Sequence, residues 1–224
     1  MRPLVLRKLI EGDAYMNVHG VAREESGRSG TSEDGIRREK LNEYHDRRIA
    51  FEASFTQGRE FRYGALNIGG IGTDKYGELC AVLSPDWTDV HKSIAYLRSD
   101  SLRHYVTRDC SVKLDTLRRD VATGDSRHCL AALKHGDRIA DLAVGDWAML
   151  VCSSEEYIEA VFVGDVTRDD FVEVRISKDE YDRLWESTFM SFCEPLDEAV
   201  SELTANFKAI LQADSDGQIH LRKI

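Results

Sequence analysis

Residues 62–83 read "RYGALNIGGIGTDKYGELCAVL", a stretch that holds five glycines and an apolar run at each end. Loops that bind phosphate lead directly into a helix, because the helix N-terminus supplies aimed N–H groups and a partial positive charge. Here the glycines lead into "ELCAVLSP", which is typical of a strand and ends at a proline. The run also lacks the P-loop lysine and the GxGxxG spacing. We therefore predict a hairpin turn or an irregular connection between two strands.

The glycines of this run suit a close approach of a ligand to the backbone. Gly69, Gly70 and Gly72 can adopt positive φ angles at little steric cost. Backbone N–H groups in a loop between strands can also form a concave site for an anion. Gly69 and Gly70 are therefore candidate binding residues.

Residues 145–177 carry the clearest strand pattern in the chain. They read "GDWAMLVCSSEEYIEAVFVGDVTRDDFVEVRIS", in which the polar groups "SSEE" and "TRDD" separate three β-rich runs. This pattern predicts an antiparallel three-strand meander near residues 146–176. The side chains expected to pack it are Trp147, Val161, Phe162 and Val172. With the strands beside the glycines, the meander predicts an α+β fold with a mainly antiparallel sheet and several packed helices.

Two segments have the apolar period of an amphipathic helix. The first runs from Ile36 to about Phe55, with Ser32 or Asp34 as the cap. The residues expected on one face of it are Ile36, Leu41, Tyr44, Arg48 and Phe51. The second covers about residues 196–212 and is expected to dock through Leu203, Phe207 and Ile210. Residues 21–35 are rich in glycine, serine and charge, which predicts a long exposed loop.

Length and composition narrow the class of protein. The 224 residues fit a single domain over residues 1–224, with 136–145 as the place where a seam between halves would fall. The formal charge of −10 disfavours general nucleic-acid binding, which needs lysine and arginine gathered on one face. No stretch approaches the roughly 20 apolar residues of a membrane span, so we expect no membrane partner.

The cysteines and histidines indicate a cytoplasmic protein without a metal. Five cysteines without a CxxC pair are typical of reduced thiols in the cytosol. The seven histidines show no ligand spacing on a clear helix, so we expect no metal site.

His19 stands out among these histidines. It follows the short apolar run "YMNV", precedes a glycine, and is expected at the end of a strand beside the polar loop. Functional side chains often lie at such strand ends. The segment from Tyr15 to Gly20 resembles an element of the ADP-ribosyltransferase superfamily, in one branch of which a strand ends in His-Gly near the start of the catalytic domain. The Ser-Thr-Ser strand and the ExE turn of other branches do not occur here.

The resemblance extends to later residues of the chain. The family continues with a region that contains tyrosine and glycine, and then with a strand that carries a catalytic glutamate. In this sequence Tyr63 and Tyr76 flank the glycine run, and Glu159 and Glu173 lie on predicted strands. The resemblance does not decide which tyrosine or which glutamate is the functional one.

The resemblance implies a reaction on NAD. The family cleaves the nicotinamide glycosidic bond of NAD and transfers ADP-ribose to an acceptor, so this chain would be an intracellular effector or defence-type protein, such as a toxin, with a macromolecular acceptor. The roles implied are a ribose contact for His19, a nicotinamide contact for the backbone of Gly20, ring stacking for Tyr63 or Tyr76, and the catalytic carboxylate for Glu159 or Glu173.

Two other classes of function remain open at this point. An acidic α+β protein suits a non-enzymatic partner of a basic toxin or nuclease, as immunity proteins and antitoxins are, with "SSEE" and "TRDD" as contacts. The runs "VGDWAMLV" and "YIEAVFVGDV" also resemble small-barrel modules that recognise nucleic acid, although the net charge argues against this class.

Overall fold

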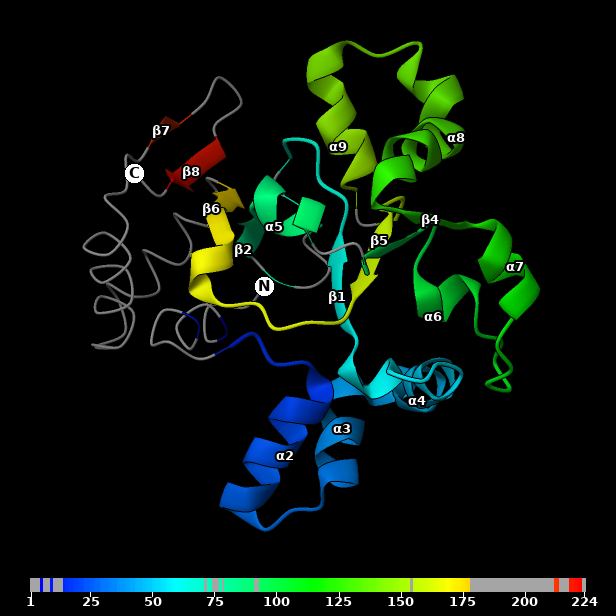
Figure 1. The fold of residues 1–224 in the computed structure, drawn as a ribbon, viewed down its shortest axis with the longest axis vertical. Coiled ribbons are helices and arrows are strands. Elements are labelled where there is room, and N and C mark those ends of the chain that lie inside the picture. The colour runs from blue at the N-terminus through cyan, green and yellow to red at the C-terminus, as the bar shows by residue number, and fades with distance from the viewer. Residues whose placement is uncertain are drawn as a thin grey trace.

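The computed structural model describes residues 14–70, 72, 73, 77, 79–90, 93–153, 155–177, 212, 213 and 218–222, together with Val5 and Leu9. These residues form helices and antiparallel strands, so the α+β fold class is confirmed (Figure 1). The α-helices are α2 (Val18–Ser29), α3 (Glu33–Leu41), α4 (His45–Ala53), α5 (Pro85–Val90), α6 (Ser101–His104), α7 (Leu114–Arg119), α8 (Arg127–Ile139) and α9 (Trp147–Val151). Short 3-10 turns are η1 (Asn42–Tyr44), η2 (Gly58–Glu60), η4 (Gly124–Ser126), η5 (Val144–Asp146) and η6 (Arg168–Asp170).

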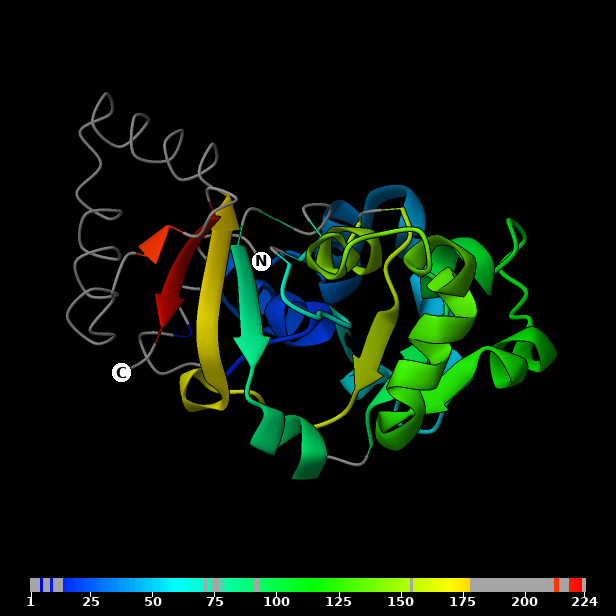
Figure 2. The ribbon, with the colours of Figure 1, turned by 90° about the horizontal axis from the view of Figure 1, so that it is seen from above.

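The described strands form two antiparallel sheets. They are β1 (Arg62–Ala65), β2 (Leu79–Leu83), β3 (Ala95–Leu97), β4 (Val121–Thr123), β5 (Glu159–Phe162), β6 (Phe171–Ser177), β7 (Gln212–Ala213) and β8 (Gln218–Arg222). The first sheet has the strand order β1-β5-β3-β4, and the second has the order β2-β6-β8-β7. Phe162 of β5 and Phe171 of β6 belong to one buried cluster, so the two sheets share a core. Figure 2 shows the strands of the two sheets from above.

Strand β5 lies at the centre of the first sheet. It pairs with β1 on one side and with β3 on the other, and all its side chains are buried. Phe162 packs edge-on against Trp87, whereas Val161 belongs to the cluster around Phe51. Because successive side chains of a strand point to opposite faces, Glu159 lies on the same face as Val161. That face is the one packed against α4 and α6.

The predicted meander over residues 146–176 is wrong. Its first run forms α9, and its other two runs, β5 and β6, lie in different sheets. The run "WAMLV" is apolar at every position, and a short apolar run without alternation fits a helix as well as a strand. Of the expected packing residues, Val161 and Phe162 are buried, Trp147 is half-buried and Val172 is 39% exposed.

The glycine run of residues 62–83 connects the two sheets. Its flanking strands are confirmed as β1 and β2, but these strands do not pair with each other. The hairpin alternative is therefore wrong, and the irregular connection is confirmed. Gly69, Gly72 and Gly77 have φ angles of 125°, 79° and 134°, which side chains with a Cβ rarely adopt.

Two predictions near the N-terminus are wrong. His19 lies in the first turn of α2 and not at the end of a strand, and residues 21–35 belong to α2, α3 and the turn between them. Asn17 caps α2, and Lys40 of α3 pairs with Glu25 of α2 at 2.8 Å. A helix hairpin that is polar on most sides lacks the apolar period by which sequence patterns reveal helices. Figure 1 shows this hairpin extending away from the sheets.

The helical prediction from Ile36 to Phe55 is confirmed, with η1 as a break between α3 and α4. Ser32 caps α3 as expected. On the predicted face, Ile36, Arg48 and Phe51 are buried. The predicted helix over about residues 196–212 lies almost wholly outside the described residues, so it stays a prediction.

Gly58 of η2 fixes the path of the chain after α4. A Cβ atom at Gly58 would lie 1.8 Å from the carbonyl oxygen of Glu52, which is a backbone atom. We expect Gly58→Ala to lower the free energy of unfolding in urea by about 1–3 kcal/mol, because backbone must move to relieve the clash.

The matched control is Gly136→Ala in α8, where the new Cβ would meet nothing within 4 Å. This control should be stabilising by about 0.5–1 kcal/mol, since alanine is the better helix former. Equal unfolding midpoints for the two variants would contradict the clash.

Candidate functional site

A buried carboxylate joins three elements of the fold. Glu52, near the end of α4, is 2% exposed. Its Oε2 lies 2.6 Å from Nε2 of His19 on α2, and its Oε1 accepts a hydrogen bond of 3.1 Å from the Tyr63 hydroxyl on β1. Because a carboxylate only accepts hydrogen bonds, this contact makes Nε2 the proton-bearing nitrogen of His19. Two predicted site residues, His19 and Tyr63, therefore meet at a residue that was not predicted.

Arg48 lies one helical turn before Glu52 and adds a positive charge to the group. Its guanidinium lies over the Tyr63 ring, 3.6 Å from the ring centroid, in a cation–π contact. Burial alone would lower the pKa of Arg48, but the nearby Tyr63, Glu159 and Glu52 more than offset this and raise it. Arg48 is thus charged at every physiological pH. The same burial raises the pKa of Tyr63, so its hydroxyl stays protonated and donates to Glu52.

Glu159 is the third predicted residue that lies near this group. Its side chain is 2% exposed, and its Oε2 accepts a 2.7 Å hydrogen bond from the backbone N–H of Ser101, at the start of α6. Burial raises the pKa of Glu159 to about 7, although Arg48 opposes the shift. Asp100 adds to it by repulsion. Glu159 therefore has a structural role at α6 and also exchanges its proton near neutral pH.

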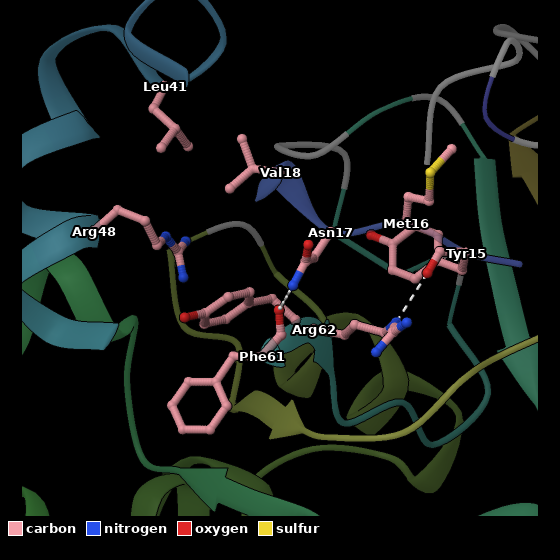
Figure 3. Close-up of a pocket in the computed structure, with 9 residues that line it drawn as sticks. Tyr15, Met16, Asn17, Val18, Leu41, Arg48, Phe61 and Arg62 are labelled. Carbon is pink, nitrogen blue, oxygen red and sulfur yellow. Dashed lines mark hydrogen bonds between the residues drawn. The ribbon is translucent and has the colours of Figure 1, made fainter. Parts of the chain in front are cut away.

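A small cavity lies beside these residues (Figure 3). Its volume is about 120 Å³. Its walls are Tyr15, Met16, Asn17, Val18, Leu41, Arg48, Phe61, Arg62 and Tyr63. Arg62 is held in place by a 2.8 Å hydrogen bond from Nε to the Tyr15 carbonyl and by an ion pair with Asp165. The segment that precedes His19 and Gly20 therefore forms one wall, and β1 forms another.

Of the remaining candidates, Gly20 lies next to the segment that lines the cavity and Glu173 lies in the second sheet. Gly20 follows His19 in α2, and its N–H is taken by the Asn17 side chain. Glu173 lies on β6 of the second sheet and pairs with Arg175 at 2.8 Å. Tyr76 lies outside the described residues.

Gly69 and Gly70 lie with Arg175 of the second sheet, as Glu173 does. Arg175 donates to the Gly70 carbonyl at 2.7 Å and to Asn67 Oδ1 at 3.2 Å, and the same Asn67 oxygen accepts from the Gly69 N–H. These polar groups satisfy one another. Gly69, Gly70 and Glu173 therefore hold the connection between the sheets and are not brought to the cavity.

Sequence reasoning missed Glu52, Arg48 and Asn17 as members of the site. Arg48 lies on the predicted apolar face of its helix, and Glu52 follows it by four residues, next to the buried Phe51. Charged residues on the buried face of a helix need partners, because burying an unpaired charge is costly. This pair at i, i+4 was the available signal.

The acidic segments proposed as partner contacts lie in turns. Glu155 is exposed and pairs with Arg103 at 3.2 Å. In η6, Asp170 accepts from the backbone and hydroxyl of Thr167, which closes the turn. Part of the acidic charge in both segments is thus used within the fold.

The proton of Glu159 generates a test of the site. In the unfolded chain its pKa is 4.5, and in the fold it is about 7. Its contribution to stability is therefore complete below pH 4.5 and is lost as the pH rises through 7, a change of roughly 3 kcal/mol. Glu159→Gln, which cannot ionise, should show a smaller loss of stability between about pH 5 and about pH 8 in urea titrations.

Glu155→Gln is the control for this experiment, because Glu155 is exposed and should leave the pH dependence of stability unchanged. The interpretation fails if the wild type and Glu159→Gln lose stability in parallel over that range.

Comparison with known proteins adds no relative. No family model, curated protein or solved structure matches the chain. Among the described residues, no helix is long and apolar enough to cross a membrane, and no three His, Cys, Asp or Glu side chains are grouped as metal ligands would be.

Proposed function

We propose that this chain binds NAD beside the Tyr63 cavity and cleaves the bond between nicotinamide and ribose, with transfer of ADP-ribose to a macromolecular acceptor. One observation carries the proposal. His19, Tyr63 and Glu159, from three separate segments, gather around Arg48 and Glu52 next to a cavity.

The reaction needs a negative group close to the ribose. The carbon–nitrogen bond breaks with its electron pair, which leaves on nicotinamide and neutralises the pyridinium charge. The ribose carbon becomes an oxocarbenium ion, and a carboxylate stabilises such an ion in the transition state. Glu159 takes this role here, because its pKa of about 7 leaves it ionised in part of the molecules at neutral pH. The acceptor then attacks the ribose carbon and loses its proton.

The other residues bind and orient the substrate. The Tyr63 ring lies in the cavity wall, and because Arg48 covers one of its faces, nicotinamide would stack on the other. Glu52 holds His19 and Tyr63 in fixed orientations through both of its oxygens, as a carboxylate orients a catalytic histidine. His19 then uses its second ring nitrogen for a ribose hydroxyl.

The size of the cavity limits which part of NAD it receives. A volume of about 120 Å³ is smaller than the roughly 300–1,000 Å³ of pockets that enclose whole cofactors. The cavity therefore takes one end of the molecule, and the rest of NAD lies outside it. Buried Glu159 requires the substrate to displace side chains of the cavity wall on entry.

The test measures nicotinamide release and NAD binding by the same set of variants. His19→Ala should weaken NAD binding itself. Glu159→Gln should lower nicotinamide release by about 100- to 1,000-fold while most ground-state binding remains, because its contribution belongs to the transition state. Calorimetric titration with NAD gives the affinities, and chromatography of nicotinamide gives the rates.

Glu173→Gln is the discriminating variant, since Glu173 lies in the second sheet, and Glu155→Gln is the surface control. Both should keep the wild-type rate. If Glu173→Gln lost turnover and Glu159→Gln kept it, the catalytic carboxylate would be Glu173, and the assignment to Glu159 would be wrong. A wild type that neither binds millimolar NAD nor releases nicotinamide, with protein and nucleic-acid acceptors present, would end the proposal.

A further inference from the structure

Arg48, which lines the cavity beside α2, has a charged nitrogen without a hydrogen bond to any described residue. Arg48 is 8% exposed, and its Nη1 has no hydrogen-bond partner among the residues that the structure describes. Leaving a buried donor unpaired costs free energy, and the cost is greater for a charged group. The neighbouring Glu52 makes its hydrogen bonds to His19 and Tyr63 and none to this nitrogen.

The N-terminus of α2 lies at the same cavity. Asn17 and Val18 form part of its wall, and Figure 3 shows the Arg48 guanidinium reaching from α4 toward them. In this 12-residue helix the Gly20 N–H is capped by Asn17 Oδ1. The N–H groups of Val18 and His19 have no hydrogen bond to any described residue. Such orphan N–H groups and the helix dipole favour an anion.

The charge of the cavity wall points the same way. Two arginines, Arg48 and Arg62, line it, and no aspartate or glutamate is among its described lining residues. Arg62 is paired with Asp165, whereas the Arg48 Nη1 has no partner among the described residues. A volume of about 120 Å³ is several times the roughly 10–15 Å³ that one water needs, which leaves room for a small oxyanion.

We infer that this cavity is a binding site for a phosphate-type oxyanion, held by the Arg48 Nη1 and by the N–H groups at the start of α2. The anion completes the hydrogen bonds that these groups lack in the free protein. Free phosphate and the phosphate of a nucleotide share this chemistry.

The oxyanion site has a consequence that rests on the proposed function. The cavity is too small for an oxyanion and nicotinamide together, so free phosphate would compete with NAD. In that case phosphate raises the apparent KM for NAD and leaves kcat unchanged.

The test of the site itself uses no NAD. The full chain is titrated with sodium sulfate and with sodium phosphate, against sodium chloride at matched ionic strength, by calorimetry and by amide NMR. Both oxyanions should bind saturably at millimolar concentration, with the largest amide shifts at Val18 and His19. ADP-ribose in a third titration separates the sources: tighter binding than phosphate identifies a nucleotide phosphate, and equal binding identifies free phosphate.

Arg48→Gln should weaken sulfate binding about tenfold or more, which is the loss of one charge-assisted hydrogen bond. The control is Arg118→Gln, because Arg118 is exposed on α7 and far along the chain from this cavity.

Should Arg48→Gln fail to fold, Arg48→Lys keeps the charge, and the wild-type amide shifts still decide the position. Absence of saturable binding in the wild type would overturn the inference, as would binding that leaves the amides of Val18 and His19 unshifted. Nicotinamide release without sulfate binding would refute this site and leave the proposed function standing.

Discussion

The hydrogen bonds of the Glu52 carboxylate hold together the part of the fold where α2, α4 and β1 meet. A buried carboxylate is costly unless its oxygens are bonded, and here one oxygen is bonded to His19 and the other to Tyr63. This requirement places the first turn of α2 against β1, which brings Asn17 and Val18 into the cavity wall. The polar helix hairpin of α2 and α3 buries few apolar side chains, so its position depends strongly on this contact.

Arg48 and Glu159 extend the same polar group into the sheet. Glu159 lies in the central strand β5, where an aliphatic side chain would have filled the space without any need for a partner. Its burial moves its proton exchange to neutral pH, and Arg48 gives the group a permanent positive charge. Titratable groups that have strongly shifted pKa values and converge from separate segments are more typical of functional sites than of a simple core. The same residues can therefore serve stability and chemistry together.

The sequence was sufficient for the fold class, for both strands beside the glycines, and for the helices between Ile36 and Phe55, because each follows from a local pattern. It also supplied His19 and Tyr63, which the structure brings to one carboxylate. The separation of β5 and β6 into two sheets could not be predicted, since strand pairing is decided by contacts far along the chain. Because strand pairing could not be predicted, nothing in the sequence indicated that Glu173, Gly69 and Gly70 lie with the second sheet and away from the site. Glu52 was missed because a buried charge on a helix is recognisable only once its partners are placed.

The order of the strands also affects how the chain can fold. Residues 62–65 must wait for residues 159–162 before they gain their partner in the first sheet, and residues 79–83 must wait for residues 171–177 in the second. Strand pairs of such long sequence separation form slowly, because the entropy cost of closing a large loop comes before any favourable contact is made. During synthesis on the ribosome, the first 150 or so residues therefore leave the exit tunnel with unpaired strand edges. A nascent chain of this kind keeps these edges open to aggregation until its central strand arrives.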